Sequence, residues 1–312
     1  MAIEKSGIEE FLRQAKDALL LDVRSPGEYA HAHIPGAFNL PLFDDEERRQ
    51  VGTAYKQQSR ETAIKIGLDF FGPKMRTMVE TVEGLLANRQ IPDKSQPGGK
   101  KVLLHCWRGG MRSAAIAWLL DLYGFRVTTL AGGYKKFRHW VLSRFEQEYP
   151  LQILGGYTGS GKTYLIKALA KTGARVIDLE HLASHKGSAF GNIGLPPQPS
   201  QEMFENLLAM ELERWLEGNQ DGDGPLWLED ESQRIGKINL PQPFWNSMRA
   251  APVTFVDIPF EARLQHILQE YGALDKDRMC DAIERIKKRL GPLETKMALE
   301  HLRTGNTADS FR

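Results

Sequence analysis

The sequence has few cysteines and no long apolar stretch. It contains two cysteines, Cys106 and Cys280, among 312 residues. Two cysteines without a CxxC pair exclude a disulfide framework and a cysteine-based zinc site. No stretch approaches the roughly 18 uncharged apolar residues of a membrane span, and residues 1–20 lack the apolar core of a signal peptide. We therefore expect a cytoplasmic protein with no membrane association, in which both cysteines are thiols.

The sequence also lacks an excess of one charge. It has 41 lysines and arginines against 40 aspartates and glutamates, a net charge of +1 at pH 7. Residues 1–150 carry 22 basic and 18 acidic side chains, whereas residues 151–312 carry 19 and 22. This balance excludes a protein whose whole surface is basic, so a nucleic-acid partner would need a local basic patch.

The length and the hydrophobic pattern predict two α/β domains with parallel sheets. Apolar runs alternate with helical patterns in both halves, and 312 residues suffice for two cores. A helix at 134–149 is expected to end at Pro150, and we place the boundary at about 145–150, giving domains at 1–145 and 146–312. The other predicted elements are strands at 18–23, 101–106, 127–130, 151–154, 175–179, 225–228 and 253–256, helices at 9–16, 74–87, 111–123, 164–171, 201–217 and from about 261 and 277, loops at 90–100 and 187–199, and a turn at 219–224.

The segment around Cys106 is typical of an anion-binding catalytic loop. It follows a predicted strand and precedes a predicted helix, so Cys106 lies near a helix N-terminus. Loop N–H groups, the helix dipole and two arginines all favour a thiolate and a bound oxyanion. A merely buried cysteine is the alternative, but the polar and glycine-rich neighbours argue against it. We predict Cys106 as the catalytic nucleophile and the following residues as its oxyanion loop: Trp107, Arg108, Gly109, Gly110, Met111, Arg112 and Ser113.

A phosphate-binding loop follows the fourth predicted strand. Residues 156–163 fit the pattern G-x-x-x-x-G-K-[ST] between a strand and a helix. Loop N–H groups would hold a diphosphate, Lys162 would neutralise its oxygens, and Thr163 would bind a metal or a phosphate oxygen. The motif leaves open whether the ligand is a nucleotide or another diphosphate ester. The predicted diphosphate-binding residues are Gly156, Gly159, Ser160, Gly161, Lys162 and Thr163.

Several further residues are candidates with simpler alternatives. Glu229 and Asp230 end an apolar strand and would give acidic or metal support to the phosphate loop, with Mg²⁺ as the candidate ion; a solvated acidic turn is the alternative. His181 and His185 have the spacing of a metal pair but no third ligand, so surface or phosphate-contacting roles are favoured. Cys280 is expected to be a packing residue.

Two basic clusters could bind nucleic acid, through phosphate neutralisation and, in the first cluster, base stacking, or could form solvated helix faces. They are Lys135, Lys136, Arg138 and Arg144 among the aromatic residues Tyr134, Phe137 and Trp140, and Arg285, Lys287, Lys288 and Arg289.

The Cys106 loop resembles those of two related families. Rhodanese-type sulfurtransferases and the rhodanese-like cell-division-cycle phosphatases share it, and residues 21–29 and 33–37 resemble the rhodanese signature. The resemblance implies a rhodanese-like fold for residues 8–140. Five residues separate Cys106 from Arg112, one more than in the usual sulfurtransferase loop and the same number as in the phosphatases. A longer loop encloses a larger anion, so we expect a phosphate-like ligand and not merely a sulfane sulfur.

The two halves together resemble the tRNA 2-selenouridine synthase family. Lys186 stands where that family has arginine, and the chain ends at Arg312, earlier than members of the family usually do. The resemblance rests on segments in both halves: 105–113, 155–163, 178–180, 185–191, 198–201, 229–232 and 235–236.

The resemblance implies that selenium from selenophosphate replaces sulfur in the wobble 2-thiouridine of tRNA. The resemblance also implies that geranyl diphosphate first geranylates this sulfur. The implied partners are then the tRNA anticodon stem-loop and a selenophosphate supply, with no tightly bound cofactor. The residues by themselves also permit a phosphatase that uses Cys106 and Arg112, an ATP-dependent kinase that uses the phosphate loop, or a non-catalytic tRNA-binding or sulfur-carrier adaptor.

Overall fold

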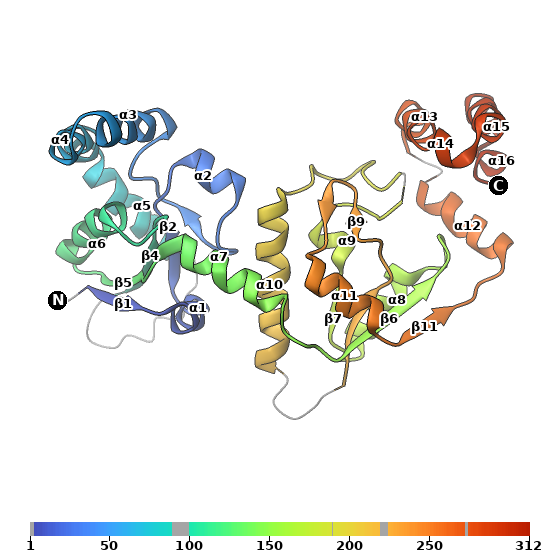
Figure 1. Cartoon of the computed structure of the whole chain (residues 1–312), viewed down its shortest axis with the longest axis horizontal. Helices are drawn as coiled ribbons and strands as arrows, with labels where there is room; N and C mark the ends of the chain where they lie inside the picture. Colours follow the sequence, from blue (N-terminus) through green and yellow to red (C-terminus); the bar gives the residue numbers. More distant parts are fainter. Residues whose placement is uncertain (1–2, 89–99, 189, 219–223, 272–273) are drawn as a thin grey trace. The chain divides into compact units, whose positions relative to one another are not determined.

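The computed structural model divides into two compact units, Met1–Ser143 and Arg144–Arg312 (Figure 1). It describes residues 3–88, 100–188, 190–218, 224–271 and 274–312. Most of the predicted loop at 90–100 and of the predicted turn at 219–224 therefore lies outside the described residues. Each unit is an α/β domain with its own parallel sheet, as the sequence predicts.

The first unit is built on a five-stranded parallel sheet in the order β1-β5-β4-β2-β3. The register pairs Asp22 with His105, so the carboxyl ends of β2 and β4 lie side by side and Cys106 follows directly. The strands are β1 (Glu4–Ser6), β2 (Leu19–Asp22), β3 (Phe38–Asn39), β4 (Lys101–His105) and β5 (Arg126–Leu130).

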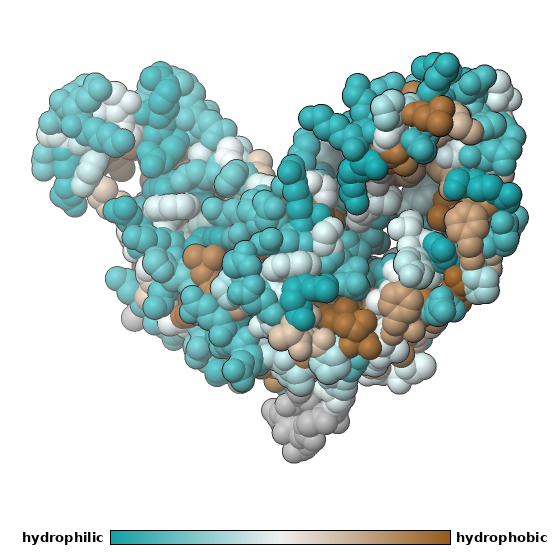
Figure 2. Space-filling view, turned by 45° about the vertical axis from the view of Figure 1, so that its right-hand side comes forward, coloured by the Kyte–Doolittle hydropathy of each residue, from teal (hydrophilic) through white to brown (hydrophobic). Residues whose placement is uncertain are grey.

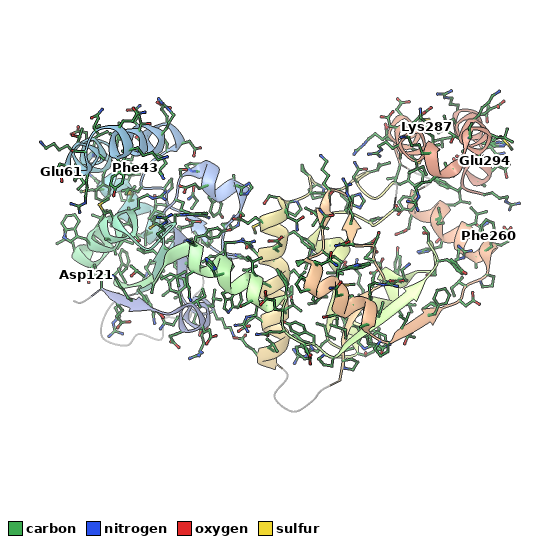
Figure 3. The ribbon with its side chains drawn as sticks, viewed as in Figure 1. Phe43, Glu61, Asp121, Phe260, Lys287 and Glu294 are labelled. Carbon is green, nitrogen blue, oxygen red and sulfur yellow. The ribbon has the colours of Figure 1, made fainter. Side chains whose placement is uncertain are left out.

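The helices of the first unit include three that the sequence analysis does not anticipate, namely α2, α3 and α4. Phe43, labelled in Figure 3, belongs to the core and packs close to Gly67 of α4, where an added Cβ would lie 3.1 Å from its Cζ. The helices are α1 (Ile8–Ala15), α2 (Pro26–His31), α3 (Asp45–Gln57), α4 (Arg60–Phe71), the 3₁₀ helix η1 (Gly72–Lys74), α5 (Met75–Asn88), α6 (Met111–Tyr123) and α7 (Gly133–Arg144).

Helix α7 ends at Arg144, five residues before the position predicted from Pro150. The Tyr149 hydroxyl donates a hydrogen bond to the Arg144 carbonyl at 2.8 Å, which satisfies one of the acceptors that a helix C-terminus leaves open. Phe145 and Tyr149 are buried. The helix therefore ends at Arg144, where the Tyr149 hydroxyl caps the carbonyl, and not at Pro150.

The second unit holds a four-stranded parallel sheet in the order β11-β6-β8-β7 and a short antiparallel pair, β10-β9. The strands are β6 (Leu151–Gly156), β7 (Val176–Ile177), β8 (Leu226–Glu229), β9 (Arg234–Ile235), β10 (Ile238–Asn239) and β11 (Val253–Val256). The helices are α8 (Lys162–Lys171), α9 (Leu179–Leu182), α10 (Gln201–Gly218), α11 (Gln242–Ala250), α12 (Phe260–Tyr271), α13 (Lys276–Arg285), α14 (Lys287–Leu290), α15 (Pro292–Arg303) and α16 (Thr307–Phe311).

Side chains near the C-terminus form a small separate core. Cys280 packs at its edge, which confirms the prediction that it is a packing residue. The buried members of this core are Ile193, Met279, Ile283, Leu299 and Leu302. Among the described residues, no helix is both long and apolar enough for a membrane span. The face in Figure 2 is mainly hydrophilic, with hydrophobic residues in separate patches.

Candidate functional site

Cys106 lies at the centre of the first candidate site, between the end of β4 and the start of α6. The residue is only 3% exposed, and its Sγ lies 3.3 Å from the Ser113 Oγ. Burial alone would raise the pKa of the Cys106 thiol. Hydrogen bonds from the Ser113 hydroxyl and from the N–H groups of Gly110, Ser113 and Arg108 outweigh burial, so the pKa is lowered. The loop therefore favours a thiolate, as a nucleophilic cysteine requires.

Two glycines allow the Cys106 loop to close against the segment that follows β5. Gly109 and Gly133 have φ values of +65° and +59°, a region that glycine adopts readily. A Cβ on Gly133 would lie 2.3 Å from the Cys106 carbonyl oxygen. That same oxygen accepts a hydrogen bond from the Tyr134 N–H at 2.8 Å. The loop is thus fixed by backbone contacts that a side chain at these positions would break.

The arginines predicted for the oxyanion loop are held differently. Arg112 donates two hydrogen bonds to the carboxylate of Glu28 on α2, at 2.6 and 3.3 Å, whereas Arg108 is exposed. Trp107 and Met111 are exposed as well. Glu28 was not among the predicted site residues, although it lies in the segment 21–29 that resembles the rhodanese signature.

A buried polar cluster lies behind the Cys106 loop, and sequence reasoning missed it as well. Arg24 is 1% exposed, donates to Asp22 at 2.9 Å and lies 3.8 Å from the ring centroid of Tyr134. Burial would raise the pKa of Asp22, but His105 and Arg24 lower it. Burial lowers the pKa of His105. His105, 3.8 Å from the Asp22 carboxylate, and the Asp22–Arg24 pair thus lie buried at the adjacent ends of β2 and β4 that carry the loop.

The phosphate-binding loop lies between β6 and α8 in the second unit. Gly156, Gly159 and Gly161 have φ values of +155°, +80° and +77°, so the motif's glycines take conformations that favour glycine. Lys162 Nζ donates to the Gly156 carbonyl at 2.9 Å. Together with Ser160 and Thr163, these residues line a cavity of about 710 Å³, large enough for a diphosphate ester.

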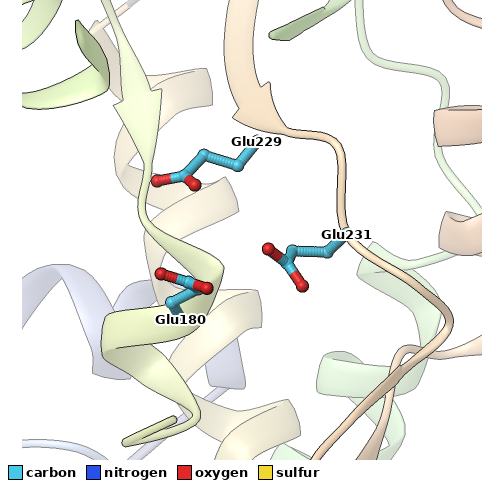
Figure 4. Close-up of side chains that lie close together, drawn as sticks. All are labelled: Glu180, Glu229 and Glu231. Atoms are coloured by element: carbon cyan, nitrogen blue, oxygen red, sulfur yellow. The ribbon is translucent and has the colours of Figure 1, made fainter. Parts of the chain in front are cut away.

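Three glutamates lie together on the wall of this cavity (Figure 4). Glu229 ends β8, Glu231 follows it, and Glu180 belongs to α9. One oxygen from each lies within 4.8 Å of the others. Thr163 Oγ1 is 3.3 Å from Glu229 Oε2 and 3.4 Å from Glu180 Oε2. The cluster therefore borders the phosphate loop.

Proximity and burial make these glutamates hard to ionise together. Burial, with the neighbouring Glu180 and Asp178, raises the pKa of Glu229 to about 7. Burial and the charge of Glu231 raise the pKa of Glu180, and burial and Glu229 raise that of Glu231. Lys162 opposes these effects in all three cases. The site thus concentrates more negative charge than the protein alone neutralises.

The residues fit a divalent cation such as Mg²⁺. Glu229 is 2% exposed, and its Oε1 has no hydrogen-bond partner among the described residues. Carboxylate and hydroxyl oxygens are the ligands that Mg²⁺ prefers. The predicted partner Asp230 also lines the cavity, but its carboxylate binds Arg249 at 2.8 Å and does not belong to the glutamate cluster. Within the described chain, the metal-binding group excludes both His181 and His185.

His185 is buried among its neighbours, yet it lines the phosphate-loop cavity, as does His181. An added Cβ on Gly191 or Gly236 would lie within 2.7 Å of the His185 ring. Tyr134, Phe137 and Trp140 are at most 5% exposed, so the expectation that they stack on nucleobases is wrong. Lys135 and Lys136 are exposed and Arg138 is half-buried, while Arg285, Lys287, Lys288 and Arg289 form a second exposed group.

The fold and the two sites define a rhodanese-like domain followed by a P-loop domain. Residues 8–139 match the rhodanese-like domain model, and residues 149–310 match the model of the tRNA 2-selenouridine synthase AAA domain. The chain belongs to the tRNA 2-selenouridine synthase family.

Named relatives agree with this assignment. The tRNA 2-selenouridine synthase of Nitrosomonas europaea is 40% identical over 259 residues, covering 82% of this chain and 64% of that protein. The enzyme of that name from Aeromonas salmonicida is 36% identical over 297 residues, covering 88% and 75%. This chain thus spans about two thirds to three quarters of their length.

Among solved structures, the N-terminal domain of a Clostridium difficile 630 protein named for ATP/GTP binding is 36% identical over 45% of this chain and 99% of that chain, with a TM-score of 0.39.

Proposed function

We propose that this chain replaces sulfur by selenium in the wobble 2-thiouridine of tRNA, using selenophosphate, through a geranylated intermediate. The observation that carries the proposal is the pairing, in one member of this family, of a low-pKa thiol in an anion-binding loop with a P-loop beside an acidic cluster. The first site suits an oxyanion the size of selenophosphate. The second suits the diphosphate of geranyl diphosphate.

In the first step, the 2-thiouridine sulfur attacks C1 of the geranyl group and diphosphate leaves. The N–H groups of the loop at 156–161 and the Lys162 ammonium stabilise the negative charge that develops on the leaving diphosphate. Thr163, Glu180, Glu229 and Glu231 would hold Mg²⁺, which would supply further positive charge to the diphosphate. Because geranyl diphosphate itself supplies the diphosphate that the loop binds, this step needs no nucleotide hydrolysis.

In the second step, selenium from selenophosphate replaces the geranylated sulfur. The Cys106 thiolate attacks the phosphorus of selenophosphate, whose oxygens its loop holds, and selenide leaves as the Se–P bond breaks. The selenide attacks C2 of the geranylated base and geranylthiolate leaves, and water then hydrolyses the phosphocysteine to phosphate and the free thiol. The tRNA phosphates bind basic residues, of which Lys135, Lys136 and Arg138 are the candidates. Access to C2 of the wobble base requires that base to leave its stack, at a cost of a few kcal/mol that backbone contacts must offset.

Reconstitution tests the proposal directly. Thiouridine-containing tRNA is incubated with the protein, geranyl diphosphate, selenophosphate and Mg²⁺, and its nucleosides are analysed by mass spectrometry. We expect 2-selenouridine with both reagents and geranyl-2-thiouridine when selenophosphate is omitted. Neither product forming under these conditions would contradict the proposal. Hydrolysis of p-nitrophenyl phosphate or ATP, measured in parallel, would instead support the phosphatase or the kinase.

The carboxyl group of Glu28, which contacts Arg112 of the Cys106 loop, does not serve the phosphatase alternative as a proton donor. A phosphatase needs a general acid for its leaving group. Burial would raise the pKa of Glu28, but its hydrogen bonds with Arg112 lower it. Glu28 is therefore ionised at neutral pH and does not supply that proton.

A further inference from the structure

A second arginine lies beside the pair formed by Glu28 and Arg112. Arg48 of α3 places its Nε 3.9 Å from Glu28 Oε2, on the same carboxylate that binds Arg112. This distance is too long for a hydrogen bond, and the buried Arg48 Nε has no hydrogen-bond partner among the described residues. One carboxylate thus separates two guanidinium groups that come from different helices.

Local contacts hold Arg48 in this position. The Gly27 N–H at the start of α2 donates to both carboxylate oxygens of Asp45 at 2.9 and 3.0 Å, which ties α2 to the first turn of α3. Gly52, one turn after Arg48, leaves space for the guanidinium, because an added Cβ there would lie 2.6 Å from Arg48 Nη1. A glycine inside a helix costs about 0.5–1 kcal/mol relative to alanine. The placement of Arg48 is therefore specified by its neighbours.

The charges of the three groups indicate what Arg48 contributes. Glu28 and Arg112 together are neutral, so the loop arginine alone attracts an incoming anion weakly. Arg48 brings the set to a net charge of +1. Burial and the positive charge of Arg112 lower the pKa of Arg48, which means that the two guanidinium groups repel each other and are under-neutralised by one carboxylate.

We propose that Arg48 and Arg112 together form an oxyanion clamp at the Cys106 loop, with Glu28 as the resting carboxylate that an incoming phosphate-like anion displaces. This inference rests on the oxyanion site of the proposed function and assigns its second cationic residue. Planar guanidinium groups bind phosphate oxygens in bidentate geometry. Glu28 keeps the two arginines in place and weakens anion binding at the same time.

The clamp is tested with inorganic phosphate as the probe and Cys106 alkylation as the readout. The protein carries Cys280→Ser, so iodoacetamide reports Cys106 alone, and the phosphate concentration that halves the alkylation rate is measured. Arg48→Ala should raise that concentration about tenfold or more. Arg48→Lys, which keeps the charge but not the fork, should raise it less. Glu28→Gln keeps an acceptor for the Ser25 N–H and should lower it several-fold.

Arg48→Ala and Glu28→Gln are expected to change phosphate protection in opposite directions, which distinguishes anion binding from a structural role. If Arg48 only supports the fold, Arg48→Ala and Glu28→Gln should both weaken protection, and that result would overturn the proposal. Arg49→Ala is the matched control, since Arg49 is the next residue and pairs with Glu46 on the surface; it should leave protection unchanged.

The assay contains no tRNA, selenium or prenyl donor, so the outcome is independent of selenation. Lack of protection by phosphate in the Cys280→Ser protein without further substitutions would refute the oxyanion site itself. Equal protection in wild type and Arg48→Ala would refute the clamp alone.

Discussion

Without divalent cations, the P-loop unit should lose stability as the pH rises from about 4.5 to 7. The pKa of Glu229 is raised from 4.5 to about 7, chiefly by burial. The folded protein therefore binds a proton that the unfolded chain has released in this range. Stability is complete below the unfolded pKa and falls as the pH rises through the folded pKa, which is the direction opposite to that of an ordinary ion-paired carboxylate.

The expected magnitude follows from the pKa difference. Each pKa unit corresponds to about 1.4 kcal/mol, so a rise from 4.5 to about 7 makes the folded state roughly 3 kcal/mol less stable at pH 8 than at pH 4.5. For a domain of this size, about 2–4 °C per kcal/mol corresponds to a fall in Tm of roughly 6–12 °C. The raised pKa values of Glu180 and Glu231 act in the same direction.

Calorimetry at several pH values, with EDTA and with Mg²⁺, measures this effect. Mg²⁺ at about 100 times its Kd should restore about 2.7 kcal/mol at pH 8. Glu229→Gln should be more stable than wild type at pH 8 in EDTA and should respond less to Mg²⁺. Asp230→Asn is the matched control, because its exposed carboxylate pairs with Arg249 outside the glutamate cluster; both responses should remain.

Two results would refute the reasoning. A Tm in EDTA that is constant or rises between pH 5.5 and 8 would mean that these carboxylates are not strained by ionisation. Equal Mg²⁺ stabilisation in wild type and Glu229→Gln would place the cation elsewhere.

Three further predictions concern the proposed reaction. Cys106→Ser should abolish selenation, because an alcohol supplies no anion at neutral pH, while Cys280→Ser should be nearly silent; selenouridine formed by the Cys106→Ser variant would exclude the nucleophile. Lys162→Ala should weaken geranyl diphosphate binding about ten- to a hundredfold without changing Cys106 alkylation, and unchanged affinity in titrations would assign the P-loop another ligand. Charge reversal of Lys135, Lys136 and Arg138 should weaken tRNA binding and reduce its salt slope by nearly one per lost phosphate contact, with little effect on free thiouridine; an unchanged slope would move the tRNA path to the exposed basic residues at 285–289.

The strongly patterned elements could be predicted, and weakly patterned ones could not. Helix α6 and strand β11 have the predicted bounds because apolar residues mark them clearly. Helices α3 and α4 were missed because their buried positions are mostly small: Ala54 in α3, and Ala63 and Gly67 beside Phe71 in α4. Their start signals were present, since Asp44 forms a capping box and Ser59 accepts from the Thr62 N–H. Capping residues would have found the helix that carries Arg48.

The aromatic residues of α7 show how composition misleads when spacing is ignored. Tyr134, Phe137 and Trp140 lie three residues apart, which places them on one face of a helix. That spacing indicates a buried face, and the structure buries all three. The lysines at the intervening positions are exposed for the same reason, so any contact of this helix with RNA is made through charge and not through stacking.

The glutamate cluster depends on strand order, which local sequence does not encode. Glu229 was found because it ends an apolar strand, but Glu180 lies 49 positions earlier and follows a strand of two residues. The two meet because β7 pairs with β8, with Ile177 opposite Leu228, so that the carboxyl ends of both strands open at the same edge as the phosphate loop. Ligands in parallel α/β sheets bind at this edge. The phosphate-loop motif therefore locates the binding edge of the sheet, but the strand order decides which other acidic residues lie at that edge.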